Sequence, residues 1–385
     1  MIQEGDVVGQ YRSRDLPWAN KSRMGAWGFC EGSFLLQEMF DQKPKPIAQE
    51  VEESTVMGTN THVVIALTTK MIKDKGLIDT FMKIPLEHEP KNSNLYFAFY
   101  SLCEEVMPPE ARVVPEFCVF ISNYCEWLVQ CWLTVAKMFG GQKWAYEKYW
   151  LPIRSEVYIE IEEDQYFGTL DAVFHNPNHA VDKIPYIIVE FKTKEASNRV
   201  REYKGQDAFS AKLPTSKMQE LHFEAYLAAN GKIPKMVRTC TSPNPNKALL
   251  KPVTCNGVVV KGKCEACGHE YTEEEKNQLP LEKRMRKAFP LAHSYKDFLA
   301  AIVFLGGHYP FSAPKRMNAR TMENVHRDVG ILRQKWADFN DPEHENYQNE
   351  DVFEWKMSDY VCPHCMRGAE CSERKMRRLM EASDE

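Results

Sequence analysis

Gly168-Thr169-Leu170-Asp171 is followed by Ile187-Ile188-Val189-Glu190-Phe191-Lys192 near the middle of this chain of 385 residues. The connection between the two runs contains the turn-forming residues Asn176, Pro177, Asn178 and Pro185. Short apolar runs separated by such residues predict two neighbouring strands. Alternate residues of a strand share a face, so Glu190 and Lys192 are expected side by side.

Two acids and a lysine on such strands are the set expected of a site that holds a divalent cation and cuts phosphodiesters. Asp171 and Glu190 offer the hard oxygen ligands that such cations prefer. The bound ion would activate water and neutralise charge on the phosphate. Lys192 would reach the same phosphate or water. An Asp, a Glu and a Lys are also common on any solvated sheet, so both interpretations stay open at this point.

The composition is that of a globular protein, with 43% hydrophobic and 27% charged residues. No apolar run approaches the length of a membrane span, and the start, MIQEGDVVGQYRSRD, is too polar for a secretory signal. We therefore expect an intracellular protein, cytoplasmic or nucleoid-associated, or in the host cytoplasm if it is viral, with no membrane partner.

The net charge of −5 gives the whole chain no broad attraction for nucleic acid, so binding would need a local basic patch. One candidate patch follows directly after the proposed site and contains Lys192, Lys194, Arg199, Arg201 and Lys204. A solvated helix face is the alternative interpretation, because Glu195 and Glu202 are interspersed.

Twelve cysteines are many for an intracellular chain, where clustered cysteines indicate metal. Cys362, Cys365 and Cys371 form C-x2-C-x5-C near the C-terminus. Three thiolates leave a tetrahedral zinc or a four-iron cluster one ligand short. Cys30 is the first candidate for the fourth ligand, and His364 is an alternative for zinc.

A second group of cysteines predicts a structural zinc site: Cys240, Cys255, Cys264 and Cys267. Cys264 and Cys267 form C-x2-C followed by a glycine, which resembles one knuckle of a zinc ribbon. The other two are single cysteines, and His269 is an alternative to either of them. Free thiols in a flexible insertion are the other interpretation.

The order of elements predicts an α/β fold with a mixed sheet and helices around it. Helices are expected at 22–42, 55–75, 113–139, 216–229, 292–305 and 317–338, and strands at 155–161, 167–175 and 185–192. Residues 231–285 are predicted to be a cysteine-rich insertion with its own metal. A third group of cysteines is assigned to the apolar core: Cys103, Cys118, Cys125 and Cys131.

Several short motifs occur in a defined order along the chain. They are His62 in G-x3-H, Asp171 in GxxD, Glu190-Phe191-Lys192 as ExK, and a following helix with Gln219, His222 and Tyr226. In this order they resemble the RecB-like nucleases of the PD-(D/E)XK superfamily. One cysteine before the core and C-x2-C-x5-C after it resemble the iron–sulfur branch of that family, which includes AddB-type domains and four-cysteine CRISPR-associated nucleases.

The resemblance implies a restriction-endonuclease-like core, formed by 1–230 and 286–385 with cluster-binding parts at both ends. Mg²⁺ or Mn²⁺ would be held by His62, Asp171, Glu190 and the Phe191 carbonyl, while Lys192 would position or deprotonate water. A structural [4Fe–4S] cluster would be held by Cys30, Cys362, Cys365 and Cys371. DNA-binding or supporting residues would be Gln219, His222, Tyr226, Lys194, Arg199 and Arg201.

The helix motif departs from the family pattern Q-x3-Y, because Gln219 has Phe223 four residues on and Tyr226 has His222 four residues before. Its register therefore stays open.

The implied activity is a metal-dependent DNA nuclease, expected to act as an exonuclease on single strands or duplex ends. No P-loop motif is present, so a helicase, recombinase, integrase or CRISPR adaptation protein is a candidate partner for unwinding. Two alternatives are a catalytically silent DNA-binding or assembly subunit and a regulatory protein whose cysteines all bind zinc.

Overall fold

The computed structural model describes residues 49–87, 89–91, 93–193, 215–242, 255–306 and 314–354, together with residues 19–21, 24, 31, 32 and 35. For residues 49–55 and 215–219 it describes the backbone alone. Part of the predicted helix 22–42 lies outside these residues, as do the C-terminal cysteines.

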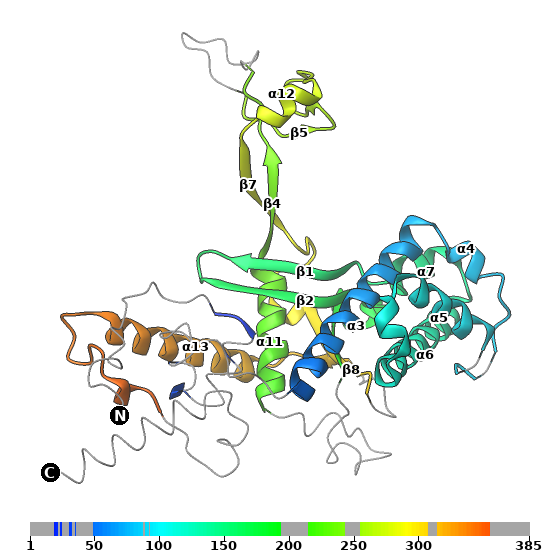
Figure 1. Cartoon of the computed structure of the whole chain (residues 1–385), viewed down its shortest axis with the longest axis horizontal. Coiled ribbons are helices and arrows are strands. Elements are labelled where there is room, and N and C mark those ends of the chain that lie inside the picture. The colour runs from blue at the N-terminus through cyan, green and yellow to red at the C-terminus, as the bar shows by residue number, and fades with distance from the viewer. Residues whose placement is uncertain are drawn as a thin grey trace.

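A mixed sheet of seven strands, counted within the described residues, forms the centre of the molecule (Figure 1). Its strands are β1 (Arg154–Ile161), β2 (Tyr166–His175), β3 (Tyr186–Lys192), β4 (Lys232–Arg238), β7 (Leu281–Lys287), β8 (Phe298–Phe304) and β9 (Lys315–Arg316). Their order is β7-β4-β1-β2-β3-β8-β9. β8 pairs with β3 in parallel and the other neighbours are antiparallel. The predicted α/β fold and its first three strands are confirmed.

Helices from the N-terminal half cover one face of this sheet. They are α3 (Gln49–Asp74), α4 (Ile78–Phe81), α5 (Asn94–Val106), the 3-10 turn η1 (Pro109–Val113), α6 (Pro115–Phe139) and α7 (Lys143–Tyr149). Their apolar side chains pack against Phe174 of β2 and Phe191 of β3 in one core. Proline at the first position of α6 suits a helix start, and Gly140 ends the helix with a φ of 64°.

The opposite face of the sheet packs against α11 (Thr215–Asn230), which in turn packs against α13 (Ala319–Asn340). Gly231 lets α11 pass directly into β4, because a Cβ there would lie 2.2 Å from Ile159 Cγ2 and 2.5 Å from the Leu227 carbonyl oxygen. The remaining short elements are α8 (His179–Asp182), β5 (Val259–Val260), β6 (Lys263–Cys264), α12 (Glu273–Gln278), η2 (Tyr295–Asp297) and η3 (Glu350–Val352).

The prediction of a helix at 292–305 is wrong. This segment forms η2 and then β8, which pairs with β3 along its whole length. Its sequence, Phe-Leu-Ala-Ala-Ile-Val-Phe, is buried along all but its last residue. A strand buried on both faces is a continuous apolar run, and periodicity alone does not separate such a run from a buried helix.

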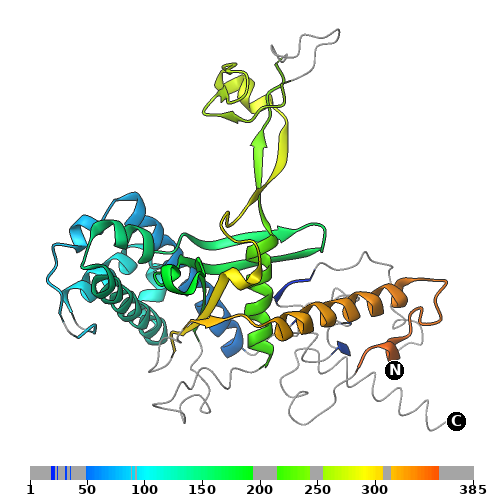
Figure 2. The same cartoon turned by 180° about the vertical axis from the view of Figure 1, so that it is seen from behind.

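The predicted insertion 231–285 is anchored in the sheet. β4 pairs with β1 through Lys232 and Glu160, and β7 pairs with β4. The two strands leave the body as a ribbon and end in the small unit of β5, β6 and α12 (Figures 1 and 2). We call β4 and β7 together the arm.

Among the described residues, none of the helices has the length and apolar character that crossing a bilayer requires.

Candidate metal centre

Three carboxylates stand at one level of three adjacent strands. β1 and β2 pair at Ser155–Ala172 and at Val157–Leu170, so Glu156 lies opposite Asp171. The pairing of β2 with β3 ends at Ala172–Val189, one residue before Asp171 and Glu190. The ladder between β2 and β3 therefore ends at the acids, while Glu190 remains paired with Ile302 of β8.

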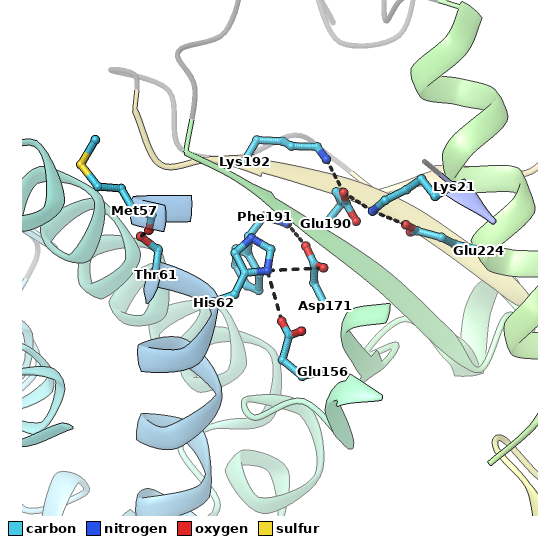
Figure 3. A network of polar contacts seen from close by, with 10 residues as sticks. All are labelled: Lys21, Met57, Thr61, His62, Glu156, Asp171, Glu190, Phe191, Lys192 and Glu224. Atoms are coloured by element: carbon cyan, nitrogen blue, oxygen red, sulfur yellow. Dashed lines mark hydrogen bonds and ion pairs between the residues drawn. The ribbon is translucent and has the colours of Figure 1, made fainter. Parts of the chain in front are cut away.

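Asp171 and Glu156 meet a histidine from the helical layer (Figure 3). His62 Nδ1, on α3, lies 3.2 Å from Glu156 Oε1 and 3.5 Å from Asp171 Oδ1. The other oxygen of Asp171 accepts a hydrogen bond of 2.8 Å from the Phe191 backbone N–H. Ligand atoms of His62, Glu156 and Asp171 all lie within 4.8 Å of one another, so this group could hold one metal ion.

Glu156 was not predicted to belong to the site. Its φ is 47°, in the left-handed region that costs a residue with a Cβ about 1 to 2 kcal/mol. Such strain at a polar residue within a strand is characteristic of functional sites. The sequence placed Glu156 in the predicted strand 155–161 and gave no other signal. Its alignment with Asp171 depends on the register between β1 and β2, which the sequence did not reveal.

Glu190 lies beside this group and is held by two ammonium groups. Its Oε1 accepts hydrogen bonds from Lys192 and, at 2.5 Å, from Lys21. The contact with Lys192 confirms that the two side chains share a face of β3. Oε2 of Glu190 is buried and has no hydrogen-bond partner among the described residues.

Lys21 joins Glu190 to a fourth acid on α11. Its ammonium donates a hydrogen bond of 2.8 Å to Glu224 Oε1, and Glu224 is 2% exposed. Burial and the nearby charge of Glu190 raise the pKa of Glu224 well above its ordinary value. Glu224 therefore favours its neutral form. Neither residue was predicted, since no local pattern marks a lysine near the N-terminus or a glutamate within a helix.

The pKa values of the two central acids are driven apart. Burial, followed by the charge of Glu190, raises the pKa of Asp171 to about 7. Burial also opposes ionisation of Glu190, but Lys21 and Lys192 outweigh it and hold the pKa of Glu190 at about 2. Burial lowers the pKa of His62, whereas its contacts with Glu156 and Asp171 raise it by more, so the net shift is upward.

The predicted supporting residues of α11 lie away from these acids. His222 Nε2 accepts a hydrogen bond of 2.9 Å from the backbone of Asn318, the N-cap of α13. The Tyr226 hydroxyl donates to Asp164 Oδ2 at 2.8 Å. Phe223 is fully buried between α11 and α13. The α11 residue that faces the carboxylates is Glu224.

The second cysteine group forms a separate centre at the end of the arm. The Sγ atoms of Cys240, Cys255, Cys264 and Cys267 all lie within 4.8 Å of one another. The Sγ distances are 3.6 Å between Cys240 and Cys267 and 3.7 Å between Cys255 and Cys264. Both exceed the ~2.05 Å of a disulfide. His269 is not among the four gathered ligands.

Neighbouring groups favour the thiolate form of Cys240 and Cys267, whereas burial raises the pKa of the Cys255 thiol to about 12. The Tyr271 hydroxyl donates to Cys240 Sγ at 3.0 Å. The Ser242 hydroxyl and the His269 backbone N–H lower the pKa of the Cys267 thiol to about 6. Gly257 is required by the close packing, because a Cβ there would lie 2.6 Å from Cys264 Sγ.

Several predicted residues lie outside the described residues, namely Cys30, Cys362, Cys365, Cys371, Lys194, Arg199 and Arg201. Only the backbone of Gln219 is described, within α11. The cysteines assigned to the helical core fit that assignment, since Cys103 and Cys125 are fully buried and Cys118 and Cys131 are partly buried on α6. No family model matches this chain, and a search of the curated proteins finds none that is similar to it.

Proposed function

We propose that this protein is a metal-dependent nuclease that hydrolyses phosphodiester bonds of DNA. The observation that carries the proposal is the alignment of Glu156, Asp171 and Glu190 across three strands, with His62 facing them. Carboxylate oxygens with one imidazole suit Mn²⁺, and Mg²⁺ also binds through one or two carboxylates.

The described residues fit such an ion in two respects. Asp171 is buried beside the charge of Glu190 and needs compensating positive charge to stay ionised near neutral pH. Oε2 of Glu190 is buried and has no hydrogen-bond partner among the described residues. His62, Glu156, Asp171 and Glu190 are the proposed ligands. A divalent cation bound there would lower the pKa of water and neutralise charge on the phosphate.

Lys192 completes the proposed chemistry. Its side chain lies on the same face as Glu190 and is 27% exposed, so solvent and substrate can reach it. A cation at this position can hold the attacking water and balance charge on a phosphate oxygen. From the resemblance to RecB-like nucleases we further propose exonuclease action on single strands or duplex ends.

Incubation of end-labelled DNA with Mn²⁺ tests the proposal. We expect the labelled DNA to be shortened in Mn²⁺ or Mg²⁺ and to stay intact in excess chelator. Lys192→Ala and Asp171→Asn should each lose this activity. The matched control is Lys137→Ala, which removes an exposed lysine from the far end of α6. A Lys192→Ala protein as active as Lys137→Ala would refute the assignment of the site.

We propose zinc for the cysteine centre of the arm. Four thiolates at about 2.3 Å from one tetrahedral ion would lie about 3.8 Å apart, and the observed distances are 3.6 and 3.7 Å. Metal analysis of the purified protein should find one zinc per chain that Cys264→Ser removes. Retention of zinc in that variant would contradict the proposal.

The iron–sulfur cluster is a separate proposal that rests on Cys30, Cys362, Cys365 and Cys371. Brown protein with an absorbance shoulder near 400 nm after anaerobic purification would support it. Iron-free, colourless protein from the same preparation would rule the cluster out.

A further inference from the structure

The arm concentrates positive charge in an acidic protein. Its two strands contain seven lysines and arginines and one glutamate, whereas the whole chain has a net charge of −5. The basic residues are Lys232, Lys235, Arg238, Lys283, Arg284, Arg286 and Lys287. A local basic strip on an acidic chain is the footprint of a polyanion-binding surface.

Some of these basic residues contact the body of the protein or the small unit of β5, β6 and α12, which we call the tip. Lys232 pairs with Glu163 at 3.5 Å, and Lys283 pairs with Glu160 and, at 3.0 Å, with Glu162. Arg238 donates to the backbone and side chain of the tip helix, and Lys287 donates to the Ala292 carbonyl. These residues hold the arm in place.

One face of the arm keeps its charge available. Lys235 lies opposite Arg284, and Arg286 is the next cross-strand position on the same face. Within the described residues Lys235 and Arg286 are exposed, and no acid lies within ion-pair distance of either. Arg284 is partly buried, donates a hydrogen bond of 2.5 Å to the Asn256 carbonyl and has one acid within ion-pair distance, Glu282 of its own strand at 3.6 Å. Like charges directly opposite destabilise a ladder. Such a pairing is therefore unfavourable for folding and indicates an anion as the partner.

The arm also has the shape and support that such a role needs. A two-stranded ribbon alone is marginally stable in water, but this one is anchored at its base by β1 and at its end by the cysteine centre. Both views show it standing away from the helical layers (Figures 1 and 2). A two-stranded ribbon fits the major groove of duplex DNA.

We infer that the face formed by Lys235, Arg284 and Arg286 binds the phosphate backbone of duplex DNA beside the proposed cleavage site. The base of the arm joins β1 at Glu160, four residues from Glu156, which is about 13 Å along a strand. Seven residues of ribbon extend about 23 Å, the length of roughly seven base pairs. The acidic residues Glu273, Glu274 and Glu275 lie on α12 at the end of the arm, so the flank of the ribbon makes the contact rather than its tip.

The inference deepens the proposed function and takes DNA as the partner from it, but its test measures binding without cleavage. Asp171→Asn serves as the parent protein, so no chelator is needed that could strip the cysteine centre. The arm variant Lys235→Glu/Arg284→Glu/Arg286→Glu is compared with a control carrying the same charge change on the helical layer, Lys83→Glu/Lys91→Glu/Lys137→Glu. Binding of a labelled duplex is measured between about 50 and about 200 mM salt.

Each phosphate contact contributes about 0.9 to the slope of log affinity against log salt, so loss of three should lower the slope by about 2.7. Affinity at the lowest salt should fall at least about tenfold relative to the control variant. A neutral variant, Lys235→Gln/Arg284→Gln/Arg286→Gln, should bind the duplex with an affinity between those of the arm variant and the control variant. Equal slopes for the arm and control variants would overturn the inference.

The two proposals fail in different ways. In the first case, the arm substitutions lower the slope of log affinity against log salt for duplex DNA, but the unsubstituted protein cleaves no DNA in Mn²⁺. The nuclease proposal then fails and the arm inference stands. If the unsubstituted protein cleaves DNA, and the arm variant with Asp171 restored cleaves duplex equally well at every salt concentration, the arm inference fails and the nuclease proposal stands. Thermal unfolding of each variant confirms that it is folded before either comparison.

Discussion

Asp171→Asn should stabilise the metal-free protein at pH 8 while it abolishes cleavage. Burial and the charge of Glu190 raise the pKa of Asp171 from 3.8 to about 7. At about 1.4 kcal/mol for each pKa unit, keeping this carboxylate ionised in the fold costs up to about 4 kcal/mol. An asparagine has the same shape and no charge, and its side-chain oxygen can still accept the hydrogen bond from the Phe191 N–H.

The pH dependence has a definite sign. An acid whose pKa is raised by folding stabilises the protein below its unfolded value of 3.8, and this contribution is lost as pH rises through about 7. The unsubstituted protein should therefore lose stability between about pH 4 and pH 7 relative to Asp171→Asn. The free energy of unfolding of Asp171→Asn should equal that of the unsubstituted protein at the low end of this range. Above pH 7 it should be larger by at least about 1 kcal/mol.

Urea unfolding at a series of pH values measures this difference. Both proteins are freed of divalent cations by gel filtration, because the difference concerns the metal-free state. Added Mn²⁺ should then stabilise the unsubstituted protein and leave Asp171→Asn much less affected, since binding to the folded state alone raises stability by mass action. An Asp171→Asn protein that is less stable than its parent at pH 8 would refute this account of the site.

Two further substitutions test the neighbours of Asp171, and a third tests the cysteine centre of the arm. Glu156→Gln should weaken Mn²⁺ binding at least about tenfold, measured by Mn²⁺-dependent thermal stabilisation; unchanged affinity would exclude Glu156 as a ligand. Lys21→Ala should destabilise the fold by about 3 kcal/mol or more, because it leaves buried acids without their shared ammonium, and adding Glu224→Gln should recover part of this loss in urea unfolding; no recovery would contradict the proposed coupling. Gly257→Ala should abolish zinc uptake, since its Cβ would crowd Cys264 Sγ, and should leave the thermal unfolding of the sheet unchanged. A variant that still binds one zinc would show that the centre rearranges to accept the Cβ.

The strands around the acids could be predicted because their signals are local. β2 and β3 are apolar runs separated by turn residues, and Glu190 and Lys192 are two apart on one strand. His62 was placed correctly on a helix, and α3 brings it to Asp171. β8 was missed for the converse reason, because burial on both faces removes the alternation that identifies a strand.

Residues whose place depends on register or on distant packing could not be predicted. Glu156 joins the site only because β1 pairs with β2 at a particular offset, and its positive φ has no sequence signature in a glutamate. The helix motif was ambiguous for a similar reason. His222 and Tyr226 have the residue types of a supporting motif, yet they brace α13 and Asp164, and the residue between them, Glu224, faces the site.

The balance of charge explains why the N-terminal region belongs to the candidate site. Glu190 and Glu224 are almost fully buried, and two such acids cannot both ionise at little cost without a cation. Lys21 supplies that cation from far along the chain, and its own pKa is raised because the charges of Glu224 and Glu190 outweigh the effect of burial. Lys21, together with Lys192, keeps Glu190 ionised, and the proton stays on Glu224. We therefore propose that Lys21 is a positioning residue, which would prepare Glu190 as an anionic ligand, while Lys192 on the same strand as Glu190 would act on the substrate.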